Sequence, residues 1–583
     1  MCTIVVTYNE AQPEVLRAMA EAVHHRGPDS LEICCHGNHG VAACRLTIFG
    51  DSKAPMIYHD PHSGRIVLLN GEIYNYFELW KELNNLGIVA NTDLEAELIS
   101  CLYGVHGPQF AKLLKGMFAI AILDKADLVL IRDRFGIKPL YFTRHGRRIL
   151  VSSEIKGLLA HPSINPILNQ SSFQETRVFG YVSSPEQTFF ENIYQVQPGQ
   201  VLVFNEAGRE QTSTFGEIPK AHFVNGQPEP DYEEAVSVTR QTILKAVERM
   251  FGHGEMDKGV FLSGGIDSST IALAAGRHSG RKLQTFTLAD SNETPDLLAA
   301  RQVAEALKTD HHEYIVTSDD YWRWLPDYVA HYEGLMAGGV FHIQGGLAFH
   351  ILSQYISKHV KVAFSGEGAD ELFGGYYWMY THPLGFSDRI RKNLAAVKDN
   401  AALTSVVDSL FPQPEDEAVY QKNLFDFLLK GGLSNYHLQS VDRSAGAFGM
   451  EIRPLYLEDD LSQWAMSLPI EYKVPNKQTT KGILRDAFRQ DFQKLGLETV
   501  LTRQKMGMPS ALANLDKAVN EKVERAVNAE DLAGHPYGAI LGSKMNLLLF
   551  DLFEHIFFKG WDHHSDLPPQ DSYLARVWPT YST

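Results

Sequence analysis

The sequence predicts a two-domain protein in which an α+β layered domain precedes an α/β domain with a parallel sheet and a helical C-terminal part. Length is the first reason, because 583 residues exceed what one hydrophobic core normally holds. A change of pattern is the second. Short β-type runs dominate up to about residue 205, whereas amphipathic helical stretches alternate with short apolar runs from about Tyr232.

The first domain is predicted to be a layered β-sandwich with helices, because its strands are short and helical patterns lie between them. A stretch rich in Pro and Gly follows and is interpreted as a linker. The predicted domain boundaries are 1–210, 211–231 for the linker and 232–583. The predicted strands are 3–7, 66–69, 118–123, 128–131, 149–152 and 201–204, and helical patterns cover 13–24 and 93–103.

The second domain is predicted to hold a parallel sheet wrapped by helices, because buried-strand runs alternate with longer amphipathic stretches. The predicted strands are 259–262, 284–288 and 360–364, and a helix is expected to follow the first of them at 270–275.

Composition excludes several function classes. The net charge of −17 argues against a general binder of nucleic acid or of an anionic membrane, because phosphates would be repelled over much of the surface. No apolar run reaches the roughly 20 residues that span a bilayer, and no signal peptide is recognised. The five cysteines are an odd number without metal-ligand spacing, which favours free thiols and a cytoplasmic location.

Cys2 is the first candidate catalytic residue. Removal of Met1 would leave a thiol and a free α-amine on one residue, so that the nucleophile carries its own base. A buried structural cysteine is the alternative, and it is the fate of most free cysteines. A thiolate that attacks a carboxamide needs donors for the oxyanion, and the Asn70 side chain and the Gly71 backbone N–H are candidates.

These residues resemble the glutaminase domain of class II, N-terminal nucleophile, glutamine amidotransferases. The family's pieces occur in its order: Cys2, Arg-Gly-Pro-Asp at 26–29, Arg45, Asn70-Gly71-Glu72 and Asp93. The resemblance implies that Arg45 holds the carboxylate of glutamine and that Asp93, helped by Glu72, holds its α-amine. Taken alone, Asp93 would read as a helix N-cap.

A glycine-rich run between an apolar strand and a helix predicts a phosphate site. It lacks the Gly-Lys-Ser/Thr ending of a Walker A loop and resembles the pyrophosphate loop of ATP pyrophosphatases. ATP is therefore the expected nucleotide and Mg²⁺ the expected ion, with Asp267 as a hard carboxylate ligand. The ATP-binding residues predicted in this part of the chain are Leu262, Ser263, Gly264, Gly265, Asp267, Ser268 and Leu288.

A second acidic, glycine-rich run follows the next predicted strand. Its three acids lie between apolar residues, and carboxylates in such a place need a cation or protons. The run Ser365-Gly366-Glu367-Gly368-Ala369-Asp370-Glu371 resembles the signature of asparagine synthetases and their relatives. The resemblance places Ser365 and Gly366 at ATP, Glu367, Asp370 and Glu371 at the acceptor and adenylate, and Asp370 at Mg²⁺. Lys481, in a Lys-x-x-Leu-Arg motif, then meets the ATP phosphates.

The resemblance as a whole implies a glutamine-dependent amide-forming ligase. ATP adenylates a carboxylic acid, aspartate by default, and ammonia released from glutamine crosses an internal apolar passage to displace AMP. Glutamine, ATP and the acid are the expected partners, and a homodimer is allowed. Alternatives are the same chemistry on another acid in a specialised pathway, an intramolecular amide former of the β-lactam synthetase type, and a first domain kept only as a scaffold.

The acceptor is the weakest point of the resemblance. Residues 334–340 offer small and apolar groups where aspartate-using enzymes carry Thr and Arg, and the stretches 451–458 and 503–509 also depart from the family. An α-carboxylate needs strong donors, which Arg443 or Arg453 are candidates to supply. The sequence therefore predicts weak turnover of aspartate and better turnover of a larger or less polar acid.

Overall fold

The fold is described from a computed structural model. The described residues are 3–48, 54–216, 230–251, 257–335, 343–376, 383–397, 401–411, 424, 427–476, 479–504, 512–562, 564 and 573–577. Three parts of the predicted sites lie outside them: Cys2, residues 336–340 of the acceptor segment, and residues 505–509. The predicted linker falls mostly on residues 217–229, which also lie outside.

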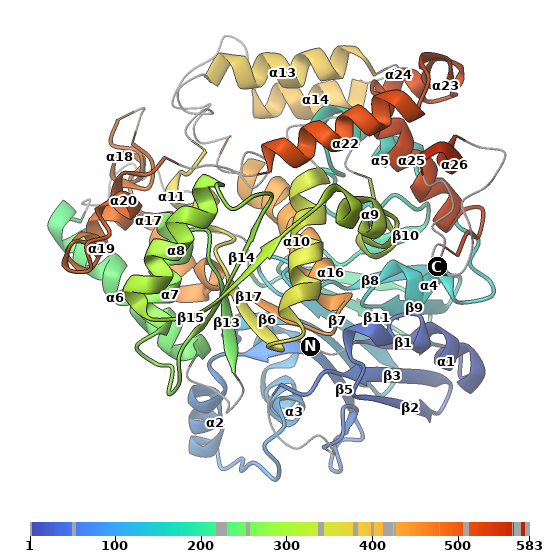
Figure 1. The fold of residues 1–583 in the computed structure, drawn as a ribbon. Helices are drawn as coiled ribbons and strands as arrows, with labels where there is room; N and C mark the ends of the chain where they lie inside the picture. The colour runs from blue at the N-terminus through green and yellow to red at the C-terminus, as the bar shows by residue number, and fades with distance from the viewer. Residues whose placement is uncertain are drawn as a thin grey trace.

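Two six-stranded antiparallel sheets form the first domain (Figure 1). The first sheet has the order β10 (Ile193–Gln195), β8 (Tyr141–His145), β9 (Arg148–Ser152), β1 (Val5–Tyr8), β3 (His39–Arg45), β2 (Ser30–His36). The second has the order β12 (Glu210–Thr214), β11 (Gln200–Phe204), β7 (Asp127–Arg132), β6 (Gly116–Asp124), β5 (Ile66–Ile73), β4 (Tyr58–His59).

Alternating apolar residues explain how these sheets stack. Val6 and Val41 of the first sheet and Leu68 and Ala121 of the second belong to one buried cluster, as expected for facing inner surfaces. Helices α2 (Tyr76–Asn85) and α3 (Glu95–His106) cover the other face of the second sheet, while α1 (Pro13–Glu21) and α4 (Ile155–Leu159) pack on the first. The predicted layered sandwich with helices is confirmed.

A five-stranded parallel sheet forms the centre of the second domain. Its order is β15 (Asp310–Ile315), β14 (Gln284–Ala289), β13 (Lys258–Phe261), β16 (Val362–Ser365), β17 (Glu451–Pro454). The chain leaves β13 toward β14 on one side, and β16 later pairs with β13 on the other side. The strand order thus reverses between β13 and β16, and ligands of open α/β sheets bind at the carboxyl ends of strands at such a point.

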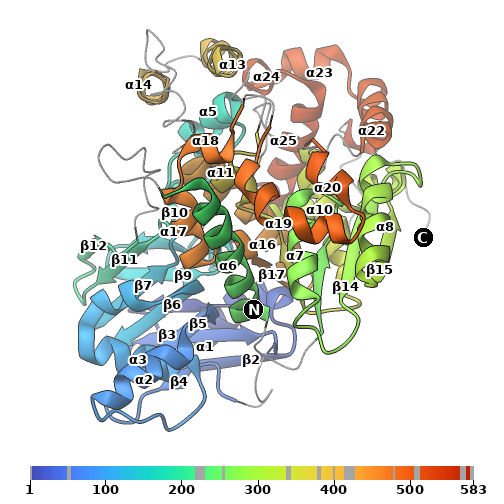
Figure 2. The ribbon, with the colours of Figure 1, turned by 90° about the vertical axis from the view of Figure 1, so that its left-hand side faces the viewer.

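Helices surround the parallel sheet and continue beyond it (Figure 2). Those used below are α6 (Tyr232–Phe251), α7 (Ile266–Ala275), α8 (Pro295–Leu307), α9 (Ser318–Tyr332), α10 (Ile343–Ile356), η3 (Leu428–His437), α16 (Leu438–Gly446), α19 (Gly482–Lys494), α20 (Glu498–Thr502) and α22 (Ala513–Ala526). None of the described helices combines the length and the apolar character needed to cross a membrane. The predicted α/β domain with a helical C-terminal part is confirmed.

The predicted strands are all present and differ from the observed ones mainly at their ends, but eight strands of the described residues were not predicted: β2, β3, β4, β8, β10, β12, β15 and β17. Strand β5 runs four residues past the predicted limit of 69, so Asn70, Gly71 and Glu72 lie within the strand. Strand β12 extends to Thr214 and pairs along its length with β11, so the second sheet continues past residue 210. Propensity misses both because pairing with a neighbouring strand, rather than local sequence, holds these residues extended.

Candidate functional site

The predicted oxyanion residues lie on β5. Asn70 is fully buried there, and it pairs with Ala119 of β6. Gly71 has φ +139°, and an added Cβ would lie 1.9 Å from the Met117 carbonyl oxygen. Only glycine fits at that point, because the backbone of β6 already occupies the space of a side chain. The sequence motif therefore has a steric reason as well as a proposed chemical one.

The predicted glutamine-binding residues lie on three different segments of the chain. Arg45 stands at the end of β3 and donates a hydrogen bond to the Pro55 carbonyl at 3.3 Å. Asp93 is exposed just before α3, whose N-cap is Leu94, so the helix-cap interpretation of Asp93 is excluded. The Glu72 carboxylate pairs at 3.0 Å with Arg453 of the second domain.

The phosphate loop follows β13 at the point where the strand order reverses. Its backbone is tight, because Gly264 has φ +70° and an added Cβ would lie 2.5 Å from the Ala299 backbone. The Ser268 hydroxyl folds back and accepts a hydrogen bond from the Ser263 N–H at 3.1 Å. Helix α7 begins directly afterwards with Gly265 as its N-cap. Backbone N–H groups at such a helix start favour an anion.

Lys481 joins this loop to the acidic run after β16. Its ammonium lies 2.5 Å from a carboxylate oxygen of Asp267 and 2.5 Å from one of Asp370. Lys481 is itself buried and adopts a left-handed backbone with φ +57°, which a non-glycine residue rarely does without a reason. An added Cβ at Gly375 would lie 1.8 Å from an Asp370 carboxylate oxygen, so that glycine leaves room for the pair. The structure thus brings three sequence motifs together.

The two carboxylates have the chemistry that a magnesium ion prefers. Among the described residues, Asp267 Oδ1 has no hydrogen-bond partner although it is buried. Carboxylate oxygens are the ligands that a hard divalent cation prefers, and Asp370 contacts the same lysine as Asp267. The donor type therefore fits Mg²⁺, and unlike the donors of a histidine cluster these carboxylates keep an oxygen, Asp267 Oδ1, that the Lys481 ammonium does not contact.

Glu371 is more deeply buried than the other two acids of the run, Glu367 and Asp370. Burial, followed by the charge of Asp370, raises the pKa of the Glu371 carboxyl to about 8. The Tyr376 hydroxyl donates a hydrogen bond to Glu371 Oε1 at 2.6 Å, and His437 Nε2 lies 3.5 Å from that hydroxyl. Ser365 is buried at the end of β16, and an added Cβ at Gly366 would lie 3.3 Å from Asp267 Cβ.

A cavity beside the phosphate loop contains residues that the sequence motifs did not assign. It is lined by Ser263, Gly265, Ile266, Asp267, Asp296, Lys481, Arg485, Arg503 and Gln504. Leu288, also predicted at ATP, is buried near the carboxyl end of β14. Asp296 was not predicted; the sequence feature that could have indicated it is its position directly after Pro295, in the first turn of α8. Arg485 belongs to the Lys-x-x-Leu-Arg motif, whereas Arg503 carried no local pattern that could have placed it here.

A buried network of charges joins the two domains. Arg26 pairs with Glu154 at 2.7 Å and with Asp442 of α16 at 2.8 Å. Arg443 pairs with Glu154 at 3.3 Å and with Glu333 at 2.8 Å. The Arg26 of the first family motif is thus an interface residue, which its sequence context did not indicate.

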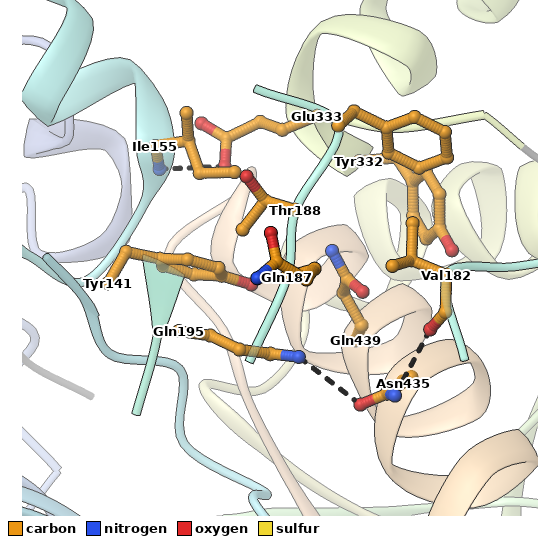
Figure 3. Close-up of a pocket in the computed structure, with 11 residues that line it drawn as sticks. Tyr141, Ile155, Val182, Gln187, Thr188, Gln195, Tyr332, Glu333, Asn435 and Gln439 are labelled. Atoms are coloured by element: carbon orange, nitrogen blue, oxygen red, sulfur yellow. Dashed lines mark hydrogen bonds between the residues drawn. The ribbon is translucent and has the colours of Figure 1, made fainter. Parts of the chain in front are cut away.

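A small cavity lies beside this network (Figure 3). Tyr141 and Gln195 approach it from the first domain and Asn435 from η3, and Gln195 Nε2 donates to Asn435 Oδ1 at 3.4 Å. Glu333 accepts a hydrogen bond from the Ile155 N–H at 2.8 Å at its edge. The space holds roughly one water-sized molecule. Amides and hydroxyls share its lining with the apolar side chains of Ile155, Val182 and Phe189.

His25, Glu154 and His331 gather next to the same network at a spacing that could hold a metal ion. However, the Lys156 ammonium lies 3.3 Å from Glu154 Oε2 and 2.9 Å from His331 Nδ1. A cation of the protein therefore already occupies this place.

Removal of the central carboxylate should weaken the domain contact strongly. Burial raises the pKa of the Glu154 carboxyl, but the surrounding positive charges, with Lys156 first, lower it well below its ordinary value of 4.5. A carboxyl with a lowered pKa contributes stability above about pH 4.5 that is lost as the pH falls. We expect Glu154→Gln to cost about 3–5 kcal/mol at pH 7, because it leaves buried arginines without their partner.

Thermal unfolding at pH 7 and at a series of pH values below 4.5 measures both effects. On acidification from pH 7, the unfolding midpoint temperature of the wild type should fall by more than that of Glu154→Gln. Glu21→Gln is the matched control, because Glu21 forms an exposed pair with Arg17. A midpoint for Glu154→Gln that equals the control's would contradict the role given to this network.

Two family models match the chain. The model described as "Asparagine synthase" matches residues 239–545, which is more than half of the chain. The chain belongs to the asparagine synthase family. The model described as "Glutamine amidotransferase domain" matches residues 1–215 of this family member. The chain is therefore a glutamine-dependent carbon–nitrogen ligase.

Curated relatives agree over most of the length. The chain is 29% identical to "Asparagine synthetase [glutamine-hydrolyzing] 1" of Bacillus subtilis (strain 168), with 90% of each chain covered. It is 32% identical to a putative asparagine synthetase of Methanocaldococcus jannaschii, covering 66% of this chain and 76% of the relative. Identity to the Gallus gallus asparagine synthetase is 28%, over 86% of this chain and 82% of the relative.

Proposed function

We propose that the second domain uses ATP to adenylate a carboxylic acid and that ammonia from the first domain displaces AMP to form an amide. One observation carries the proposal: the loop after β13 and the acidic run after β16 converge on Lys481 at the carboxyl edge of the parallel sheet. This is where an α/β sheet binds nucleotides.

In the glutaminase half, the Cys2 thiolate attacks the side-chain carbonyl of glutamine and releases ammonia, leaving a thioester that water hydrolyses. The Asn70 amide and the Gly71 N–H stabilise the oxyanion. Arg45 pairs with the substrate carboxylate, and Asp93, with Glu72, pairs with its α-amine. Support comes from the buried Asn70 and from the glycine-only backbone at residue 71.

In the synthetase half, the N–H groups at the start of α7 and the Lys481 ammonium hold the phosphates. Asp267 and Asp370 would hold Mg²⁺, which when bound neutralises phosphate charge during adenylation. Glu367 and Glu371 face the acceptor and its adenylate. The acceptor oxygen attacks the α-phosphorus, and pyrophosphate leaves with the bonding electrons.

Aspartate is the first candidate acceptor, because the curated relatives are named asparagine synthetases. A second candidate, a larger or less polar acid, is favoured by where two arginines lie. Arg443 and Arg453 are both buried. Arg443 forms ion pairs with Glu333 and Glu154. Arg453 forms ion pairs with Glu72 and Glu451. The expectation that either one supplies charge to an acceptor carboxylate is not supported, since each already binds carboxylates of the chain.

Product analysis with a panel of acids tests the proposal. We expect glutamine, ATP and a suitable acid to give glutamate, AMP and pyrophosphate in equal amounts, because the phosphate loop lacks a Walker ending. Steady-state pyrophosphate release at equal concentrations compares aspartate with larger and less polar acids. A dominant ADP product would overturn the chemistry. If aspartate has by far the highest kcat/KM, the second candidate is wrong and aspartate is the acceptor.

A further inference from the structure

Arg503 is a cation in the ATP cavity that neither sequence motif assigned. It follows α20 and lines the cavity with the phosphate-loop residues Ser263 and Gly265. Arg503 Nη1 donates a hydrogen bond to the Ser263 carbonyl oxygen at 3.1 Å. The same guanidinium pairs through Nη2 with Asp296 in the first turn of α8. This arginine therefore touches the loop on which the phosphates are proposed to lie.

The other cations of the cavity are already engaged. Lys481 lies between the carboxylates of Asp267 and Asp370. Arg485 is used for the backbone: its side chain donates to the carbonyl oxygens of Thr480 at 2.9 Å, Leu501 at 2.6 Å and Arg503 at 2.9 Å. Among the described residues lining the cavity, this leaves Arg503 as the cation with a single carboxylate as its ion-pair partner.

The contacts of Arg485 also explain how Arg503 is held in place. By binding the carbonyls of Leu501 and Arg503, Arg485 fixes the backbone from which the Arg503 side chain projects. Arg485 is a positioning residue in this arrangement, because its guanidinium is occupied by main-chain oxygens. The Arg of the Lys-x-x-Leu-Arg motif thereby gains a role distinct from that of its lysine.

We propose that Arg503 binds the pyrophosphate leaving group and that Asp296 is its counter-ion in the empty site. The guanidinium leaves Asp296 to bind pyrophosphate and pairs with Asp296 again when pyrophosphate departs. This inference rests on the proposed function. When the acceptor oxygen bonds to the α-phosphorus, the bond from that phosphorus to the bridging oxygen breaks, and pyrophosphate carries away the electron pair. The planar guanidinium matches the growing phosphate charge with two parallel hydrogen bonds.

Inhibition by inorganic pyrophosphate tests the exchange in the full-length protein. The assay measures AMP formation with ammonium salts as nitrogen source and with the acid that gives the highest rate. Because a charge-assisted contact is lost, Arg503→Gln should raise the inhibition constant of pyrophosphate about tenfold or more. Arg503→Lys should recover part of this loss. Asp296→Asn should lower the constant, because the competing carboxylate is gone. Arg525→Gln, at an exposed arginine of α22, should change nothing.

Glutamine hydrolysis by the first domain serves as the folding check for each variant. If the wild type forms no AMP, the proposed function fails. If the wild type forms AMP and pyrophosphate but Arg503→Gln keeps the wild-type inhibition constant, this inference alone fails. Should Arg503→Gln lose glutamine hydrolysis as well, Asp296→Asn decides: a lower constant supports the exchange, and an unchanged or higher one overturns it.

Discussion

Lys481→Met should abolish most amide synthesis while leaving glutamine hydrolysis intact. The lysine ammonium lies 2.5 Å from carboxylate oxygens of both Asp267 and Asp370, and methionine has nearly the same length without the charge. Its loss removes a preorganised positive charge from the proposed phosphate site and leaves the carboxylates of Asp267 and Asp370 without their shared partner. Removal of one such electrostatic group typically costs about 10²–10³-fold in kcat. AMP formation with ammonium salts measures the loss.

The matched control lies at the far end of α19, the helix that Lys481 precedes as its N-cap. Lys494→Met removes an exposed lysine in the last turn of α19 and should leave both activities unchanged. Lys481→Arg keeps the charge, but the tight packing against Gly375 should make it a poor replacement, since an added Cβ there would lie 2.4 Å from Lys481 Cε. Wild-type AMP formation by Lys481→Met would show that the phosphates lie elsewhere.

The sequence predicts the strand, turn and helix start that carry this half of the candidate site, because these features are local. Gly264 permits a tight turn, and a helix start after a buried strand gives the anion site. Both are short-range features that periodicity and turn chemistry reveal. The convergence of Asp267 and Asp370 also follows, because strands of a parallel sheet place their carboxyl ends at one edge.

The interface between the domains could not be predicted in the same way. Arg26 and Asp442 pair across more than 400 residues, and nothing in the neighbourhood of either one in sequence specifies the other. Glu72 pairs with Arg453 for similarly non-local reasons. Buried ion pairs depend on geometry from many elements at once, because each charge must find a partner to offset its desolvation. Arg503 could not be predicted for the same reason, because its contacts are to Ser263 and Asp296, which are distant in sequence.

Gly71→Ala should remove glutamine-dependent activity and leave ammonium-dependent synthesis. The methyl group would lie 1.9 Å from the Met117 carbonyl oxygen, at a backbone φ of +139° that alanine rarely adopts. Strand β5 must shift to make room for the methyl group. The shift displaces both proposed oxyanion donors, the N–H of residue 71 and the side chain of Asn70. We expect glutamine hydrolysis to fall by about 10²-fold or more, the typical effect of losing an oxyanion donor. Glutamate release with glutamine and AMP formation with ammonium salts are measured side by side.

Two companion variants separate chemistry from strand damage. Gly64→Ala also places alanine at a positive φ, but no atom lies within 4 Å of the new methyl group, so glutamine hydrolysis should stay near the wild-type rate. Cys2→Ala removes the proposed nucleophile without touching β5, and it should lose glutamine use as completely as Gly71→Ala while keeping ammonium use. If Gly71→Ala hydrolyses glutamine normally, residue 71 is not part of an oxyanion site. If Gly71→Ala loses both activities while Cys2→Ala loses one, β5 supports the fold of both domains rather than the chemistry of the first.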